Sequence, residues 1–356
     1  MALGAVLTVK AWLKLWLEEK VRLRESTRRS YSELSRNHLV PTLGGIRLAD
    51  LNAQHVAAML EEVRACHARG GTPVSEGTVA RVYATLRAAL NCAVRDGLVP
   101  VNPALLVKPG GMRRPRAVVW TEDRVEQWRQ DGIRPPVAVW TAAQTARFLH
   151  QTMDDRLYAV FHLIALRGLR RGEAAGLRWC DADLDGGTIY IDRQLQQRDR
   201  QLVQGPPKTS SSGRAVALDA TTASVLRRHR VLQRTEARAL GRAPSGYVFT
   251  NEHGDPATPD YLTRRFAELL ADTDLPPIRL HDLRHVAASL AIQACADLKV
   301  IQDQLGHSSI VITADTYVSI LPDHARKAAE DTARLIAYAG RRAPGARRPR
   351  QPAKSG

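Results

Sequence analysis

The sequence HDLRH at residues 281–285 is followed by LGH at 305–307 and by DTY at 315–317. These motifs set two histidines, an arginine and a tyrosine in a fixed order near the C-terminal end of the chain. A tyrosine hydroxyl has an ordinary pKa near ~10, so it is a poor nucleophile unless neighbouring groups supply charge and proton transfer. Arginine and histidine supply both. The order of these motifs therefore points to chemistry at a tyrosine hydroxyl.

Two further motifs lie upstream. GLRRGE at 168–173 places Arg170 three residues before Glu173, on one face of an expected helix. KTSSSGR at 208–214 places Lys208 in a loop rich in turn-forming residues. Guanidinium groups stay charged and hold phosphate oxygens through two parallel hydrogen bonds, so this set of residues suits phosphoryl transfer.

Together these motifs resemble the active site of the tyrosine recombinases, the phage-integrase family, over residues 140–338. The resemblance is greatest to integrases of actinobacterial phages or integrative elements. It implies a catalytic set of six residues, namely Arg170, Lys208, His281, Arg284, His307 and Tyr317. In this set the arginines bind the scissile phosphate, the lysine donates a proton to the departing 5′ oxygen, and the histidines hydrogen-bond the phosphate and assist proton transfer. The tyrosine attacks.

Three neighbouring residues are expected to support the set. Glu173 is expected to orient the basic groups, although a surface ion pair with Arg170 explains the same spacing. Asp282 is expected to cap or brace the helix that carries the HDLRH motif, and His285 to pack behind it. His281 and His285 also stand four residues apart, as zinc ligands do, but the HExxH glutamate is missing and an arginine would adjoin the metal. No metal or other cofactor is expected.

Residues 1–108 are expected to form an all-α domain that resembles the SAM-like core-binding domain of the family. Apolar spacing predicts helices beginning at Thr8 and Thr27, the second ending before PTLGG at 41–45, and two more over 53–68 and 78–96. Large integrases of the family carry an arm-binding domain before this one. None is visible here, so either the protein lacks it or the start of the chain is truncated.

Residues 109–137 are expected to be a linker with an inserted helix, followed by the catalytic domain over 138–338. A short motif occurs twice, as VVWTEDRVEQW at 118–128 and AVWTAAQTARF at 138–148, each time with a threonine suited to cap a helix. Strands are expected at 188–192 and 214–218 among helices beginning near 221, 259, 281 and 297. The predicted fold class is therefore mainly α with a small antiparallel sheet in the catalytic domain (α+β).

The chain carries 52 Lys and Arg against 36 Asp and Glu, a net charge of +16, which suits a polyanionic partner. Residues 339–356 are expected to be a basic, disordered tail. No base-reading residue is identifiable, and the basic candidates for DNA contact in the N-terminal helices and linker include Arg28, Arg29, Arg113 and Arg114. Four scattered cysteines without a CxxC pair indicate reduced thiols in a cytoplasmic protein, and no apolar stretch is long enough to span a membrane.

The resemblance therefore implies a site-specific recombinase that integrates or excises a mobile element through a 3′-phosphotyrosine and a Holliday junction. Expected partners are double-stranded DNA attachment sites and three further copies in a homotetramer, with an excisionase or host DNA-bending factor as a further candidate. Its location would be the cytoplasm, on the nucleoid. A type IB topoisomerase, a chromosome-dimer resolvase and a DNA-binding regulator that has lost catalysis are the alternatives.

Two positions depart from the family pattern. Arg167 precedes the GLR motif where threonine is common, and Cys295 stands where a helix-ending glycine is usual. A cysteine in left-handed backbone costs about 1 kcal/mol, so local strain is expected at Cys295.

Overall fold

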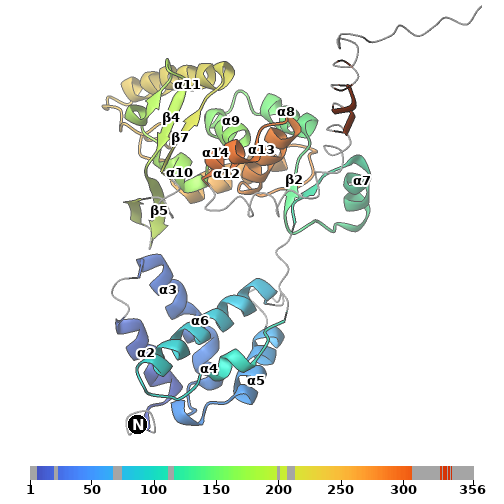
Figure 1. Cartoon of the computed structure of the whole chain (residues 1–356). Coiled ribbons are helices and arrows are strands. Elements are labelled where there is room, and N and C mark those ends of the chain that lie inside the picture. Colours follow the sequence, from blue (N-terminus) through green and yellow to red (C-terminus); the bar gives the residue numbers. More distant parts are fainter. Residues whose placement is uncertain are drawn as a thin grey trace, which may run out of the picture. The chain divides into compact units, whose positions relative to one another are not determined.

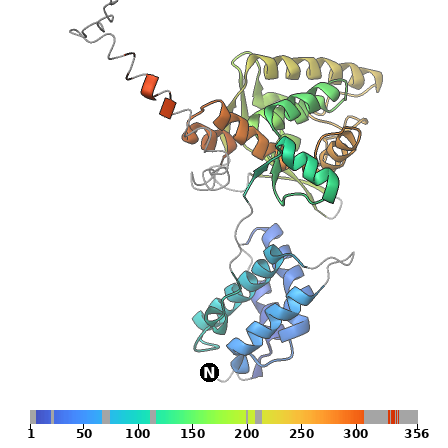
Figure 2. The same ribbon diagram turned by 90° about the vertical axis from the view of Figure 1, so that its right-hand side faces the viewer.

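The computed structural model describes residues 6–19, 23–66, 74–110, 116–198, 201–206, 213–306 and, within the last forty residues, 329, 330, 332–334, 336 and 338. The chain divides into two compact units, Met1–Arg114 and Pro115–Gly356 (Figures 1 and 2). Within these described ranges, no helix combines the length and the apolar character that crossing a membrane requires. The architecture is mainly α with small β-sheets, which confirms the predicted fold class.

The N-terminal unit is a bundle of helices around its own apolar core. Its main helices are α2 (Val9–Glu19), α3 (Glu25–Leu34), α5 (Ala53–Ala65) and α6 (Glu76–Arg95). The Thr8 hydroxyl accepts from the backbone N–H of Ala11 at 3.2 Å, which confirms the predicted cap of the first helix. Trp12, Leu13 and Trp16 are buried on one face of α2, as their spacing predicted.

The second helix of this unit does not end before the PTLGG motif, so that prediction was wrong. From α3 the chain continues as a π-helix over Ser35–Leu39 and then as α4 (Val40–Leu43), which includes Pro41. A proline has no N–H to donate and disrupts a regular α-helix. The wider π-turn precedes the proline here and lets the helical path continue past it.

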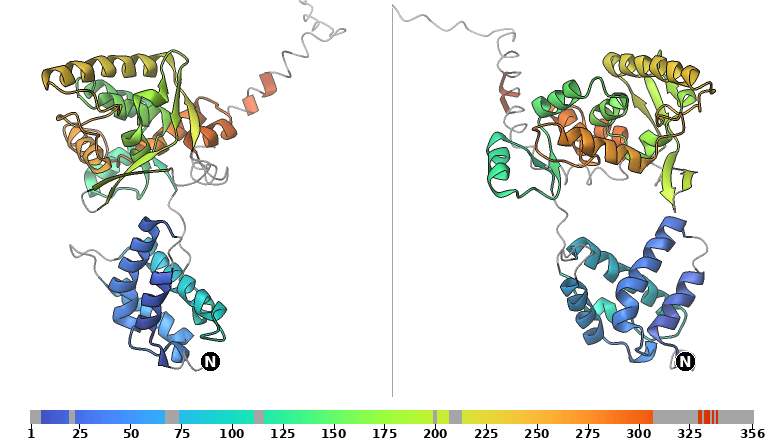
Figure 3. Two further views of the ribbon diagram at one scale, coloured as in Figure 1. Left: turned by 90° about the vertical axis from the view of Figure 1, so that its left-hand side faces the viewer. Right: turned by 180° about the vertical axis from the view of Figure 1, so that it is seen from behind.

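The second unit surrounds a larger core built by helices and a three-stranded sheet. Its helices are α7 (Glu122–Asp131), α8 (Ala142–Gln151), α9 (Tyr158–Arg167), α10 (Arg171–Gly176), α11 (Ala220–Ala239), α12 (Pro259–Ala271), α13 (Asp282–Gln293) and α14 (Leu298–Leu305). Helices α9 and α13 pack against each other in its centre, and α11 lies beside the sheet (Figures 1 and 3).

The sheet is antiparallel, in the order β3 (Ala182–Asp183), β4 (Thr188–Ile191) and β7 (Arg214–Ala217). The predicted strands at 188–192 and 214–218 are therefore confirmed. A separate antiparallel hairpin, β5 (Gln194–Arg198) with β6 (Gln201–Gly205), was not predicted. Strand β5 packs against α10, where Gly172 and Gly176 leave room for the backbone of Leu195.

The two copies of the repeated motif lie side by side. Strand β1 (Val118–Val119) pairs in parallel with β2 (Ala138–Val139), and α7 connects them. The two tryptophans that follow these strands donate to consecutive carbonyls: Trp120 Nε1 to Pro277 at 3.3 Å and Trp140 Nε1 to Pro276 at 2.8 Å. The described part of the expected linker from residue 116 onward thus packs on the second unit's core, and the structure divides the chain at Arg114–Pro115.

Candidate active site

Arg170 is held at the start of α10 by its own helix. Helix α9 ends at Gly168, which has left-handed backbone (φ 68°), and this turn brings Arg170 to the N-cap of α10. The Arg170 backbone N–H donates to Glu173 Oε2 at 3.0 Å, and its Nη1 donates to Glu173 Oε1 at 2.6 Å. The spacing of three residues in GLRRGE therefore lets Glu173 accept from both the backbone N–H and the guanidinium of Arg170, which fixes both groups.

Arg284 projects from the first turns of α13 and is 3% exposed. Its Nη1 donates to the Gly168 carbonyl at 2.6 Å and its Nη2 to the Leu305 carbonyl at 2.6 Å. Arg170 Nη2 donates to the next carbonyl, that of Gly306, at 3.0 Å. The two predicted arginines are thus brought to the same place, the C-terminal end of α14.

Glu173 is 1% exposed and accepts hydrogen bonds from two arginines. Burial alone would raise the pKa of its carboxyl, but Arg214 and Arg170 outweigh burial and hold the pKa below its ordinary value. The carboxylate is therefore ionised at neutral pH. A surface ion pair does not describe this buried carboxylate, which faces Arg170 and Arg214 at once.

Arg214 was not assigned a role from the sequence. It begins β7, its side chain is 6% exposed, and its Nη2 donates to Glu173 Oε2 at 2.9 Å. The available signal was its position as the last residue of KTSSSGR: an arginine that opens a strand after a turn-rich loop points its side chain to one fixed face of the sheet.

His281 and Asp282 lie at the start of α13. Asp282 is 2% exposed, and its carboxylate accepts from the backbone N–H and the guanidinium of Arg279 at 3.0 to 3.1 Å. It therefore braces the turn that leads into the helix. Desolvation and then the charge of Arg284 lower the pKa of His281. His281 is nevertheless an exposed residue, which limits how far desolvation lowers its pKa.

His285 follows one turn later, and its ring meets that of His281 edge to face, with centroids 5.5 Å apart. Desolvation, followed by the neighbouring His281, lowers the pKa of His285 to about 4. At neutral pH His285 is uncharged and adds no positive charge to the site. Its partial burial behind His281 fits a residue that packs against the site.

Three predicted catalytic residues, Lys208, His307 and Tyr317, lie outside the described residues, as do Arg113, Arg114 and the tail from 339. Two other candidates for DNA contact are described. Arg28 pairs with Glu25 and Arg29 with Glu33 in solvent-exposed ion pairs on α3.

The two departures from the family pattern have structural correlates. Arg167 Nη2 donates to Asp219 Oδ2 at the start of α11. Burial alone would raise the pKa of Asp219, but hydrogen bonds from Thr222 and the Arg167 guanidinium outweigh burial and lower the pKa. Cys295 has φ 60°, which confirms the expected left-handed backbone.

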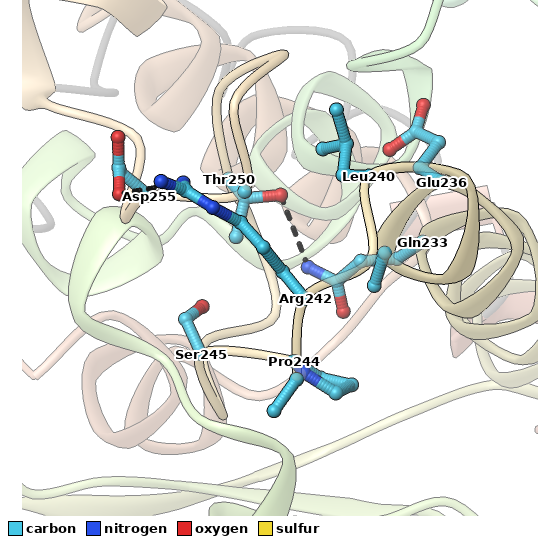
Figure 4. Close-up of a pocket in the computed structure, with 11 residues that line it drawn as sticks. Gln233, Glu236, Leu240, Arg242, Pro244, Ser245, Thr250 and Asp255 are labelled. Carbon is cyan, nitrogen blue, oxygen red and sulfur yellow. Dashed lines mark hydrogen bonds and ion pairs between the residues drawn. The ribbon is translucent and has the colours of Figure 1, made fainter.

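A pocket elsewhere in this unit is lined by none of the residues above. It lies between the C-terminal end of α11 and residues 242–255 (Figure 4). Its polar side chains bind one another: Gln233 Nε2 donates to Thr250 Oγ1 at 3.2 Å, and Arg242 lies 3.9 Å from Asp255. The first pair connects α11 to the loop that follows it, and the second pair lies within that loop.

The described part of the candidate active site therefore carries four arginines (Arg170, Arg214, Arg279 and Arg284) and two carboxylates (Glu173 and Asp282), a net charge of +2 with both histidines neutral at neutral pH. Fixed guanidinium groups that keep an excess of positive charge are suited to the extra negative charge of a phosphoryl-transfer transition state. Arg170 and Arg284 provide two such groups at one helix end.

Both units of the chain match models of known protein families. The model of the phage integrase family matches residues 139–324, and that of the phage integrase N-terminal SAM-like domain matches residues 8–62. A XerC-like tyrosine recombinase of Caldanaerobacter subterraneus is 28% identical over 273 residues, covering 72% of this chain and 66% of the relative. The integrase of Mycobacterium phage D29 is 27% identical over 311 residues, covering 86% and 74%.

Solved structures agree on the fold. The Tn1549 transposon integrase in complex with transposon right end DNA superposes with a TM-score of 0.71 at 21% identity, covering 92% of this chain and all of that one. A lambda integrase tetramer bound to a Holliday junction gives a TM-score of 0.56 at 17% identity, covering 86% and 79%. Because the family model spans more than half of the chain and the helical unit before it matches the accompanying domain, this chain belongs to the phage integrase family of tyrosine recombinases.

Proposed function

We propose that this protein is a site-specific DNA recombinase, an integrase of a mobile element, that cleaves and rejoins DNA through a 3′-phosphotyrosine. The observation that carries the proposal is the convergence of Arg170 and Arg284 on one helix end, with Glu173 ionised between Arg170 and Arg214. Such a pair can hold both nonbridging oxygens of one phosphodiester. The chain spans 66% of the length of the first two relatives it matches.

The chemistry would proceed in two transfers. The Tyr317 hydroxyl gives its proton to a histidine of the set and attacks the scissile phosphorus, which forms a phosphotyrosine at the 3′ end and breaks the bond to the 5′ oxygen. Lys208 gives that oxygen a proton. The free 5′ hydroxyl then returns a proton to the lysine as it attacks the phosphotyrosine of a partner strand, which breaks the bond to the tyrosine, and the released tyrosine recovers its proton from the histidine. The ester keeps the bond energy, so ATP is not required. Two rounds pass through a Holliday junction and yield recombinant duplexes.

The charge of the residues supports these roles. Arg170 and Arg284 would stabilise the pentacoordinate phosphorus, where negative charge develops. Because the pKa of His281 is lowered, this ring would enter the reaction neutral, with one nitrogen able to accept a proton and the other able to donate one. His307 would hydrogen-bond the phosphate from the segment after α14.

We propose double-stranded attachment sites as the substrate, and a homotetramer as the active assembly on two synapsed sites. The net charge of +16 supports extensive contact with phosphates, a part of the binding that depends on salt and carries no sequence information. Strand exchange between four half-sites supports four subunits. An excisionase or a host DNA-bending factor would set direction. This reaction would place the protein in the cytoplasm, on the nucleoid.

A nicked suicide duplex carrying the element's attachment core tests the reaction class. Wild-type protein and Tyr317→Phe would be compared on a denaturing gel without ATP or divalent metal. Tyr190→Phe, which alters an exposed tyrosine on β4, is the matched control. A covalent band at the 3′ phosphate with wild type and Tyr190→Phe, absent with Tyr317→Phe, is the expected result.

Other outcomes identify the alternatives. DNA binding without a covalent band from wild type would contradict the enzyme and leave a DNA-binding regulator. A covalent band accompanied by relaxation of supercoiled DNA that lacks any attachment core would favour a type IB topoisomerase. Recombination of two core sites on separate plasmids would establish strand exchange between partners.

A further inference from the structure

Three arginines bind three consecutive carbonyl oxygens at the C-terminal end of α14. The carbonyls of residues 304, 305 and 306 accept, in this order, from Arg214 (Nε, 2.7 Å), Arg284 (Nη2, 2.6 Å) and Arg170 (Nη2, 3.0 Å). The arginines come from three separate elements: the first residue of β7, the body of α13 and the N-cap of α10. One helix end thus joins parts of the site that are distant in sequence.

Helix chemistry explains the attraction. The last carbonyls of an α-helix have no partner within the helix and carry the negative end of its dipole. Gly306 ends α14 with left-handed backbone, φ 64°. A guanidinium group is a favourable partner for such an end because it is always charged and offers several donors in a fixed plane.

Besides the helix end, Arg214 binds Glu173, the carboxylate that also holds Arg170. Its Nη2 donates to Glu173 Oε2 at 2.9 Å, while the other oxygen of that carboxylate accepts from Arg170 Nη1 at 2.6 Å. Arg214 therefore binds both the carboxylate that holds Arg170 and the helix end to which Arg170 also bonds. Its side chain is 6% exposed.

Gly306 provides independent evidence that the Arg214 guanidinium packs closely against the end of α14. A Cβ atom at residue 306 would lie 3.0 Å from Arg214 Nη1 and 3.2 Å from its Cδ. These distances are tighter than ordinary carbon contacts, so a side chain here would press on Arg214. The close approach of Gly306 and the hydrogen bonds to Gln304 and Glu173 restrict the Arg214 side chain.

We propose that Arg214 is a positioning residue of this active site: its one guanidinium sets Glu173, and through it Arg170, in register with the end of α14. The residue after Gly306 is His307, so the hydrogen bonds at the end of α14 also fix the backbone that precedes that histidine. This inference rests on the proposed recombinase function. Arg214 acts through Arg170 and α14 and is not itself a ligand of the scissile phosphate.

The proposal separates cleavage from DNA binding. Affinity for DNA is the sum of contacts to many phosphates, and one positioning residue contributes little to it. The rate of cleavage depends on the geometry of Arg170 at the reacting phosphate, where a displacement of about 1 Å can cost roughly 100-fold. Loss of Arg214 should therefore slow strand cleavage at saturating protein and leave the dissociation constant nearly unchanged.

The test compares Arg214→Gln and Arg214→Lys with wild type in single-turnover cleavage of the suicide duplex. The matched control is Arg156→Gln, because Arg156 also joins a carboxylate, that of Glu236, to the Thr250 and Asn251 carbonyls, away from the site. Dissociation constants and thermal unfolding are measured for every protein, and rates are compared below the lowest unfolding transition.

We expect Arg214→Gln to cleave about 10- to 100-fold more slowly, with DNA affinity within about threefold, while Arg156→Gln cleaves at nearly the wild-type rate. Lysine has one nitrogen for two partners, so Arg214→Lys should fall between Gln and wild type. Should Arg214→Gln fail to fold, the lysine variant decides: a slower rate at unchanged affinity supports the proposal, and the wild-type rate overturns it.

Two further results would overturn the proposal. One is an Arg214→Gln protein that cleaves as fast as wild type. The other is an unchanged saturated rate with affinity weakened tenfold or more, which would make Arg214 a DNA contact. Failure of the recombinase function itself gives a different result, since wild type would then form no covalent complex at all.

Discussion

Replacing Cys295 by glycine should stabilise the second unit. Helix α13 ends in a pair of backbone hydrogen bonds: the Cys295 N–H donates to the Ile292 carbonyl at 2.8 Å, and the Ala296 N–H donates to the Ala291 carbonyl at 3.0 Å. This is the Schellman arrangement, in which the residue at the position of Cys295 takes left-handed backbone and is usually glycine. Cys295 has φ 60°.

The magnitude follows from two opposing terms. A side chain with Cβ in left-handed backbone costs roughly 1 to 2 kcal/mol, which glycine removes. Glycine in turn gives the unfolded chain more freedom, which costs about 0.4 to 1 kcal/mol. The cysteine side chain is exposed, and its Sγ lies 4.0 Å from the Gln293 carbonyl, too far to contribute much. The net gain should be about 0.5 to 1 kcal/mol, or roughly 1 to 4 °C in the unfolding temperature of a unit this size.

Differential scanning calorimetry of the full chain measures this shift, with Cys295→Ala as the control that removes the sulfur and keeps Cβ. Cys295→Asn should lie between alanine and glycine, because asparagine tolerates left-handed backbone better than most residues. The reasoning would be refuted by a glycine variant no more stable than the alanine variant. A gain in Cys295→Ala equal to that in Cys295→Gly would assign the effect to the thiol.

Gly168→Ala should destabilise the protein by at least about 2 kcal/mol and slow cleavage, because φ is 68° and the new Cβ would lie 2.4 Å from Leu305 Cδ2; an unchanged melting temperature would contradict this. Since the pKa of His285 falls from an ordinary 6.5 to about 4 on folding, protons favour the unfolded chain below pH 6.5. Stability should decline as pH falls from 6.5 to 4, by about 3 kcal/mol from this residue, and urea unfolding of His285→Asn should show a shallower decline. Trp140→Phe should cost about 1 to 2 kcal/mol by leaving the Pro276 carbonyl without its 2.8 Å donor, and more than Trp120→Phe, whose bond is 3.3 Å; equal melting temperatures would contradict that order.

The sequence predicted the features that depend on local pattern. Helix positions followed apolar spacing, and the left-handed backbone of Cys295 followed from its place at a helix end. Thr141 caps α8 as expected, whereas Thr121 stands at the N-cap of α7 without a side-chain hydrogen bond to the helix. The approach of Arg170 to Arg284 was inferred from family resemblance, because nothing in the local sequence states that residues 114 positions apart share a helix end.

What the sequence did not reveal depends on tertiary contact. The β5–β6 hairpin is rich in glutamine and lacks a tight-turn dipeptide, so neither propensity nor turn chemistry marked it. Strands β1 and β2 have two residues each, too few for a periodic signal. A proline normally follows the end of a helix, but here the π-helix before Pro41 lets the helical path continue past it. The role of Arg214 arises only where β7, α10 and α14 meet.

The pairing of β1 with β2 makes the α7 segment a natural point for engineering. The chain leaves the paired strands after Val119 and returns to them at Ala138. Adjacent strands lie about 4.8 Å apart, so the two exits are separated by roughly 10 Å or less. A foreign domain whose own termini lie that close together could replace residues 122–135 and leave both tryptophan anchors in place, provided that it covers the core where Val125 and Trp128 now pack.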